Sequence, residues 1–133
     1  MKVASVARRD VVTCFPNTPL HEVAEVMVRK GVGSVVVVNP TSPTKPLGII
    51  GERDVLRAYV LGVDPNTPAS QVMNKLVATV DAEAHVAEVV MAMKENNIRR
   101  VVVIRGGELY GVVALRDILF NIPALKAVVD YFS

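Results

Sequence analysis

The clearest indication of the fold is the segment Gly48-Ile49-Ile50-Gly51-Glu52-Arg53-Asp54, which recurs as Gly111-Val112-Val113-Ala114-Leu115-Arg116-Asp117. The repeat extends upstream, where residues 4–38 align with residues 70–104 without a gap and share nine identities in 35 positions. The first copy is three residues longer, within the segment 40–46, whose turn-forming composition predicts an exposed loop. The chain is therefore a tandem duplication of a unit of about 66 residues.

Both copies predict the order strand, helix, strand, strand, helix. Apolar residues at helical spacing indicate the first helix, and β-branched runs indicate buried strands. The predicted elements cover residues 11–13, 20–28, 35–38, 47–50 and 53 onward in the first copy, and 77–80, 86–93, 101–104, 109–113 and 116 onward in the second. A second-copy hairpin turn is expected at 105–108, since this segment contains two glycines.

The ends of the two first helices carry different signals. Thr18 and Pro19 predict a side-chain cap and a proline in the first turn. Ala84-His85 stands there in the second copy and predicts a less well capped start. Gly31 and the pair Asn96-Asn97 are expected to end the helices.

These elements predict an α+β fold of tandem β-α-β-β-α repeats, with 1–64 as the first repeat and 65–133 as the second. A single unit of this size is marginally stable, because it buries little apolar surface. We therefore expect one intertwined module, a pseudo-twofold pair with a cleft at the interface of its repeats.

Composition excludes several function classes. The 15 basic and 13 acidic residues give a net charge of +2 and form no basic arm, which does not favour a dedicated nucleic-acid reader. One cysteine, Cys14, and two distant histidines predict no disulfide and no zinc site. The sequence shows no apolar run of membrane-spanning length and no signal-like segment, so we expect a cytoplasmic protein.

The polar residues that both copies share, and that a core does not need, are the candidate site. Asp54 and Asp117 start a helix after a strand, where a carboxylate can accept hydrogen bonds from two vicinal hydroxyls such as those of ribose. Aspartate is also common at helix starts for electrostatic reasons alone. Its recurrence in one Gly-x-x-x-x-Arg-Asp frame favours the functional interpretation. Thr13 and Thr79 recur at the ends of the short first strands.

Gly33-Ser34 and Arg99-Arg100 occupy equivalent places before the central strands. Adjacent side chains diverge in an extended chain, so one or both arginines are candidates to face a phosphate, which guanidinium binds with two hydrogen bonds. Two solvated surface arginines are the alternative. Arg53 and Arg116 are candidates for the same role or for pairing with a neighbouring carboxylate.

The chain resembles a stand-alone pair of cystathionine-β-synthase (CBS) domains, or Bateman module. The resemblance runs from about residue 3 to residue 122. Segments 3–7 and 69–73 resemble the short helix that usually precedes each CBS unit. The matching motifs are 11–13, 35–38 and 48–54 in the first copy, and 77–79, 98–103 and 111–117 in the second.

The resemblance implies two clefts for adenosine-containing ligands. By position, Asp54 and Asp117 would hold the ribose hydroxyls, and Thr13 and Thr79 would line the sugar and base. Backbone groups beside Val12 and Ala78 would read the adenine edge. Gly33-Ser34 would serve the cleft containing Asp117, while Arg99 and Arg100 would reach phosphates. AMP is the expected ligand, with ADP, ATP, NAD and S-adenosylmethionine as further candidates, and no cofactor is required.

One departure from the family pattern concerns the phosphate. The family often places Ser or Thr three residues before the aspartate, whereas Gly51 and Ala114 stand there in this chain. Phosphate binding would then depend on backbone N–H groups at the helix start and on arginines. The departure is also compatible with one weak or empty cleft, and the concentration of arginines in the second copy favours the cleft with Asp117.

The leading interpretation is a regulatory ligand sensor without chemistry of its own. An enzyme would need a nucleophile and base from Cys14, Ser34, His21 and His85, but these histidines are expected on the surface and Cys14 in the core. A nucleic-acid-binding module and a purely structural dimerisation module stay as alternatives. The family resemblance implies a homodimer, and a regulated target is expected to be a separate, unidentified protein. The apolar stripe of the C-terminal segment 122–132 is expected to pack on the core or contact a second subunit.

Overall fold

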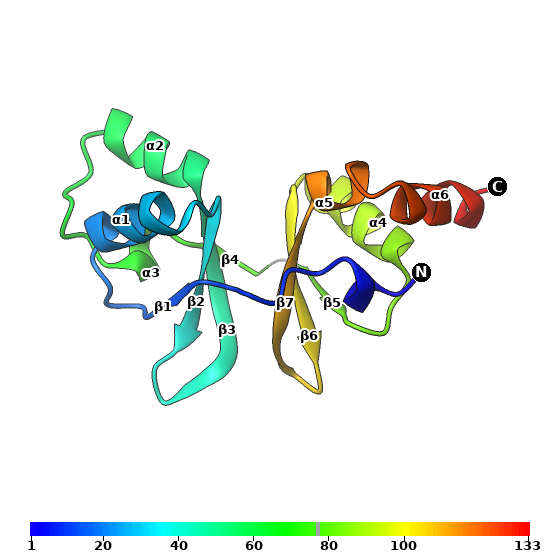
Figure 1. Cartoon of the computed structure of the whole chain (residues 1–133). Helices are drawn as coiled ribbons and strands as arrows, with labels where there is room; N and C mark the ends of the chain where they lie inside the picture. Colours follow the sequence, from blue (N-terminus) through cyan, green and yellow to red (C-terminus); the bar gives the residue numbers. More distant parts are fainter. Residues whose placement is uncertain (77) are drawn as a thin grey trace. The chain divides into compact units, whose positions relative to one another are not determined.

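The computed structural model describes residues 1–76 and 78–133, which form two compact units (Figure 1). One unit contains residues 11–76. The other contains residues 78–133 together with the N-terminal segment Met1–Asp10. The N-terminal segment thus packs with the second repeat, and the segment that ends at residue 76, just before β5 (Thr79–Asp81), packs with the first repeat. The predicted division of the sequence into repeats 1–64 and 65–133 stays a prediction.

The unit of residues 11–76 contains one four-stranded sheet in the order β1-β2-β3-β4. Its elements are β1 (Thr13–Cys14), α1 (Leu20–Lys30), β2 (Ser34–Asn39), β3 (Ser42–Gly51), α2 (Glu52–Val60), α3 (Ala69–Val72) and β4 (Asn74–Lys75). β1 runs parallel to β2, while β3 is antiparallel to both β2 and β4. The helices α1 and α2 cover one face of this sheet (Figure 1).

The expected loop at residues 40–46 is wrong over most of its length. β3 already begins at Ser42, and Asn39 pairs with Ser42 at the tip of the hairpin. The pairing register shifts on both sides of Val38, which absorbs the additional residues of this copy as a lengthened hairpin. The turn-forming residues of this segment therefore lie mostly within strand β3 instead of forming a separate loop.

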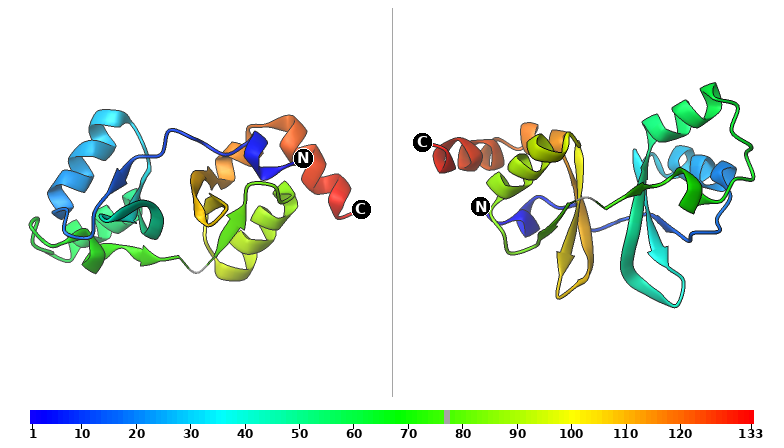
Figure 2. Two further views of the ribbon diagram at one scale, coloured as in Figure 1. Left: turned by 90° about the horizontal axis from the view of Figure 1, so that it is seen from below. Right: turned by 180° about the vertical axis from the view of Figure 1, so that it is seen from behind.

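The other unit repeats the arrangement with a three-stranded sheet in the order β5-β6-β7. Its elements are a 3₁₀ helix η1 (Val3–Ser5), β5 (Thr79–Asp81), α4 (Val86–Asn96), β6 (Arg100–Arg105), β7 (Glu108–Ala114), α5 (Leu115–Leu119) and α6 (Ile122–Tyr131). Val77, predicted as the first residue of the strand before α4, lies outside the described residues. The helices α4, α5 and α6 lie on one face of the sheet in both views of Figure 2. The predicted α+β fold with two β-α-β-β-α units is confirmed.

The helix starts reverse the expected capping. α1 begins after Pro19 without a side-chain cap, and the hydroxyl of Thr18 instead accepts from the backbone N–H of Phe15 at 3.0 Å. In α4, Nδ1 of His85 accepts from the Ala87 N–H at 3.0 Å, so this histidine is the cap. Histidine is a less usual capping residue, and the sequence signal therefore favoured the wrong helix. Gly31 and Asn97 end α1 and α4 in the left-handed conformation, as expected.

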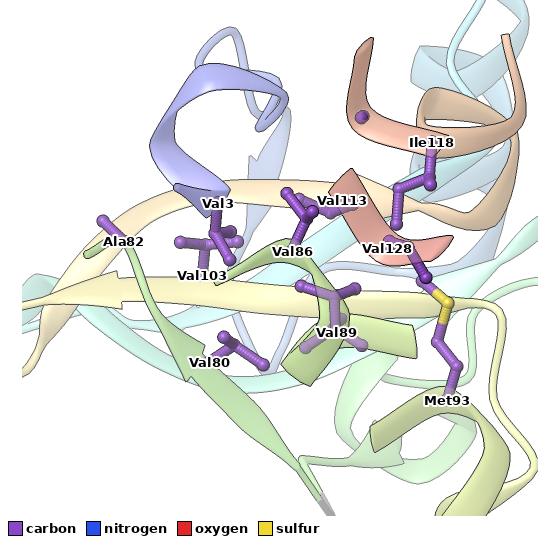
Figure 3. Close-up of a cluster of buried hydrophobic side chains, with 12 residues drawn as sticks. Val3, Val80, Ala82, Val86, Val89, Met93, Val103, Val113, Ile118 and Val128 are labelled. Carbon is purple, nitrogen blue, oxygen red and sulfur yellow. The ribbon is translucent and has the colours of Figure 1, made fainter. Parts of the chain in front are cut away.

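Each sheet packs its helix-facing side into a separate apolar core. The core of residues 11–76 includes Val23, Val35 and Ile50, which are fully buried. In the other unit Val3 of the N-terminal segment joins Val86 and Val103 (Figure 3). Burial of such a side chain contributes about 1.5–3 kcal/mol, so Val3 anchors the segment from which Arg8 extends.

The C-terminal helix packs on the core of its own unit, as one of the two alternatives expected. Ala124 and Val128 are its buried residues, and Figure 3 shows Val128 beside Met93 of α4. Three members of the apolar stripe are nevertheless partly exposed: Leu125, Val129 and Phe132.

Candidate functional site

Asp54 lies in the first turn of α2, directly after β3. Its Oδ2 atom accepts from the backbone N–H of Gly51 at 2.7 Å, which caps the helix and fixes the carboxylate. The side chain retains 15% of its accessible surface. Exposed Arg57, one turn further along α2, places Nη1 3.5 Å from Oδ1.

Asp117 has the same place in the second repeat. Its Oδ2 atom accepts from the Ala114 N–H at 2.8 Å, at the junction of β7 and α5. The side chain is 11% exposed. The helix-start interpretation and the functional interpretation of the two aspartates are therefore compatible, because the capping bond uses one carboxylate oxygen.

A segment that connects the two units along the chain lies beside the strand that precedes each aspartate. We call these two segments, which contain Arg8 and Asn74-Lys75, the linker segments. In the first unit Lys75 of β4 pairs with Gly48, and a Cβ at Gly48 would lie 2.8 Å from the Asn74 carbonyl oxygen. In the other unit Arg8 pairs with Val112, and a Cβ at Gly111 would overlap the Arg8 carbonyl oxygen. Only glycine permits this approach. The shared glycine of the repeated motif thus admits the linker segment.

The linker residues that reach the aspartates differ. Asn74 donates from Nδ2 to Oδ2 of Asp54 at 2.8 Å. Arg8 donates from Nε to Oδ1 of Asp117 at 3.1 Å, as a charge-assisted bond. Sequence reasoning missed both residues. The available signal was their position, because Arg8 and Asn74 are equivalent in the alignment of residues 4–38 with 70–104.

The shared threonines lie on the sheet faces opposite the helices. Thr13 pairs with Val36 and Thr79 with Val102, while the next residues, Cys14 and Val80, point into the cores. Both threonines are exposed, and their contact with a ligand stays a prediction. Beside them Val12 and Ala78 are partly buried, and the Val12 carbonyl already accepts from the N–H of Val36 at 2.9 Å.

The dipeptides before the central strands meet the helix starts of their own units. Ser34 pairs with Gly51, and the Gly33 carbonyl accepts from the Glu52 N–H at 3.1 Å. Likewise Arg100 pairs with Ala114, and the Arg99 carbonyl accepts from the Leu115 N–H at 2.8 Å. The first two N–H groups at each helix start are therefore already bonded. Two backbone donors of the expected phosphate site are thus occupied at each helix start, and the binding of phosphate by arginines stays a prediction.

The candidate arginines are mostly solvent-facing. Arg53, Arg99 and Arg116 are exposed and have no side-chain ion-pair partner among residues 1–76 and 78–133. Arg100 is partly buried. Gly33-Ser34 belongs to one unit and Asp117 to the other, so their expected common cleft stays a prediction.

The residues considered for an enzyme have structural roles. Burial raises the pKa of the Cys14 thiol to about 11, which disfavours the reactive thiolate. His21 contacts Glu25 one turn along α1 at 3.2 Å, and His85 caps α4. Within the described part of the chain, no three His, Cys, Asp or Glu side chains are placed to hold a metal ion. Likewise, none of the helices in residues 1–76 and 78–133 has the length and apolarity needed to cross a membrane.

The family model of the CBS domain matches this chain twice, at residues 3–61 and 63–124. The chain therefore belongs to the CBS domain family, as a tandem pair. The resemblance drawn from the repeated motifs is thus confirmed.

Three proteins illustrate this relationship. An uncharacterised protein of Methanopyrus kandleri is 38% identical over 133 residues, which covers 98% of this chain and 67% of that protein. A CBS domain-containing protein of Bacillus subtilis is 30% identical over 112 residues, or 84% of this chain and 78% of that protein. A solved CBS domain protein of Pyrobaculum aerophilum, complexed with AMP, has a TM-score of 0.92 at 30% identity, covering 98% of this chain and 99% of that one. None of the three is named as an enzyme.

Proposed function

We propose that this chain is a regulatory module that binds an adenosine nucleotide, with AMP as the preferred ligand, and catalyses no reaction. The observation that carries the proposal is the likeness, over nearly the full length of both chains, to a CBS domain protein complexed with AMP. The capped aspartates agree with it, because each holds its carboxylate in a fixed position and a carboxylate is the group that accepts hydrogen bonds from a vicinal diol.

Ribose and phosphate would be bound by different kinds of residue. Asp117 or Asp54 accepts hydrogen bonds from the ribose hydroxyls, and Thr79 or Thr13 lies along the sugar and base. The 5′-phosphate is bound by guanidinium groups, since Gly51 and Ala114 provide no hydroxyl. ADP, ATP, NAD and S-adenosylmethionine remain alternative ligands for the same groups.

A calorimetric titration of the purified chain with each of the five ligands tests this proposal. Saturable binding is expected, tightest for AMP, and Asp117→Ala should weaken it at least tenfold by removing charge-assisted hydrogen bonds. Absence of saturable binding to all five would contradict the proposal. Turnover of AMP or ATP that persists through repurification would contradict the non-enzymatic part of it.

A homodimer that regulates a separate protein completes the proposal. The exposed face of α2 supports it, because Leu56, Tyr59 and Val60 are 64%, 84% and 80% exposed. Phe120 and Ile122, which flank the junction of α5 and α6, are similarly exposed. We expect light scattering to give twice the chain mass, and Tyr59→Glu to give the single mass. A monomeric wild-type chain would contradict this part.

A further inference from the structure

The hydrogen-bond capacity of Asp54 is unevenly used. Each carboxylate oxygen offers about two lone-pair sites. Oδ2 of Asp54 accepts from both Gly51 N at 2.7 Å and Asn74 Nδ2 at 2.8 Å, so its capacity is filled. Only Oδ1 remains, and Arg57 lies 3.5 Å from it. This carboxylate cannot accept one hydroxyl on each oxygen while Asn74 stays in place.

The orientation of Asn74 is supported by a second acceptor. Its Nδ2 atom also lies 3.5 Å from the Ile49 carbonyl oxygen, and the backbones of these two residues are paired between β3 and β4. The amide nitrogen therefore faces two acceptors. Reversal of the amide would place its oxygen against a carboxylate and a carbonyl, which is unfavourable.

Asp117 is left with one acceptor site on each oxygen. Oδ2 accepts only from Ala114 N at 2.8 Å, and Oδ1 accepts only from Arg8 Nε at 3.1 Å, among the described residues. The arginine side chain is 54% exposed, and no other acceptor among residues 1–76 and 78–133 contacts its guanidinium. The ion pair also neutralises the local charge, which lowers repulsion of an anionic nucleotide.

We propose that the linker residues Arg8 and Asn74 decide which aspartate takes the ribose: Asp117 is the open site, and Asn74 closes Asp54. Arg8 is a positioning residue that holds the Asp117 carboxylate and compensates its charge. The inference rests on the proposed function, since it assigns the nucleotide to one of two otherwise equivalent carboxylates. The ligand class is a ribonucleotide monophosphate with a free 2′,3′-diol.

The stoichiometry of AMP binding tests the role of Asn74. By calorimetry we expect one AMP per wild-type chain and two per Asn74→Ala chain, because the substitution frees Oδ2 of Asp54. Addition of Asp54→Ala to Asn74→Ala should remove the gained site. Lys75→Ala is the matched control on the same exposed strand and should keep one site. Two sites of equal affinity in the wild type, or one site in Asn74→Ala, would overturn the inference.

The affinity of the wild-type site tests the role of Arg8. Arg8→Ala should weaken AMP binding about tenfold, the effect of one charge-assisted hydrogen bond. Arg8→Gln should restore part of this loss at low salt, since it can donate without the charge. Arg29→Ala removes one exposed positive charge on α1 and should change affinity less than twofold. Unchanged affinity in Arg8→Ala would overturn the positioning role.

Failure of the inference is distinct from failure of the proposed function. A wild-type chain that binds none of the five adenosine ligands contradicts the function itself. A wild-type chain that binds AMP at a ratio other than one per chain contradicts only the assignment to Asp117. AMP binding that is unchanged in the Asp117→Ala variant does the same. A diol-free control, 2′,3′-dideoxyadenosine monophosphate, should bind at least tenfold more weakly than AMP. Equal binding would contradict recognition through a carboxylate.

Discussion

The two repeats hold their aspartates in one backbone frame but give them different partners. In both, a carboxylate caps the helix after the strand, and a glycine admits a linker segment beside it. The linker then presents a neutral amide at Asp54 and a guanidinium at Asp117. A duplicated unit can therefore retain its backbone geometry while the residues of the connecting segment give its two aspartates different partners.

Alanine substitution of the two glycines of the repeated motif should change the free energy of unfolding more than the other substitutions, and by different amounts in the two repeats. Gly111→Ala should lower the free energy of unfolding by about 1–3 kcal/mol, because the new Cβ overlaps the Arg8 backbone carbonyl. Gly48→Ala should lower it less, since the new Cβ would lie 2.8 Å from the Asn74 backbone carbonyl oxygen and its closest contact, at 2.5 Å, is the flexible Met73 side chain. Urea unfolding of both variants measures the difference. A smaller loss of stability in Gly111→Ala than in Gly48→Ala would contradict the close approach of the Arg8 backbone to Gly111.

The starts of α1 and α4 should respond differently to removal of their polar side chains. His85→Ala should cost about 1 kcal/mol of stability, because the Ala87 N–H loses its acceptor. His85→Asn should restore most of this, as asparagine is a strong capping residue. Thr18→Ala should leave the start of α1 intact, since its hydroxyl bonds to Phe15 instead. Thermal unfolding distinguishes them, and helix loss confined to Thr18→Ala would contradict the assignment.

Replacement of Cys14 by valine, the residue at the equivalent position 80, should have the smallest effect on stability. Cys14 and Val80 both lie in the core, so Cys14→Val should change stability by less than about 1 kcal/mol at neutral pH. The thiol pKa is raised by burial from 9.0 to about 11, so the unfolded chain loses its proton first. The stabilising contribution is therefore complete below pH 9.0 and lost as pH rises towards about 11. A wild-type chain without this alkaline loss relative to Cys14→Val would contradict the thiol burial.

The regular part of the molecule could be predicted from the sequence. Valine runs and helical spacing located β2, β6, α1 and α4, and the repeated frame placed Asp54 and Asp117 at helix starts. These features depend on neighbouring residues. The partners of the aspartates did not follow, because Arg8 and Asp117 are 109 positions apart and Asn74 and Asp54 are 20 apart. Such contacts depend on which strand edge a linker joins, which local patterns do not specify.

A crystal structure of the chain with AMP would show directly which aspartate binds the ribose. We expect a ribose diol on the two oxygens of Asp117, with Arg8 still bonded to Oδ1 and Asn74 still bonded to Asp54. A ribose bound to Asp54 with Asp117 unoccupied would contradict the assignment. A crystal saturated with AMP but without nucleotide at either aspartate would contradict the proposed nucleotide binding itself.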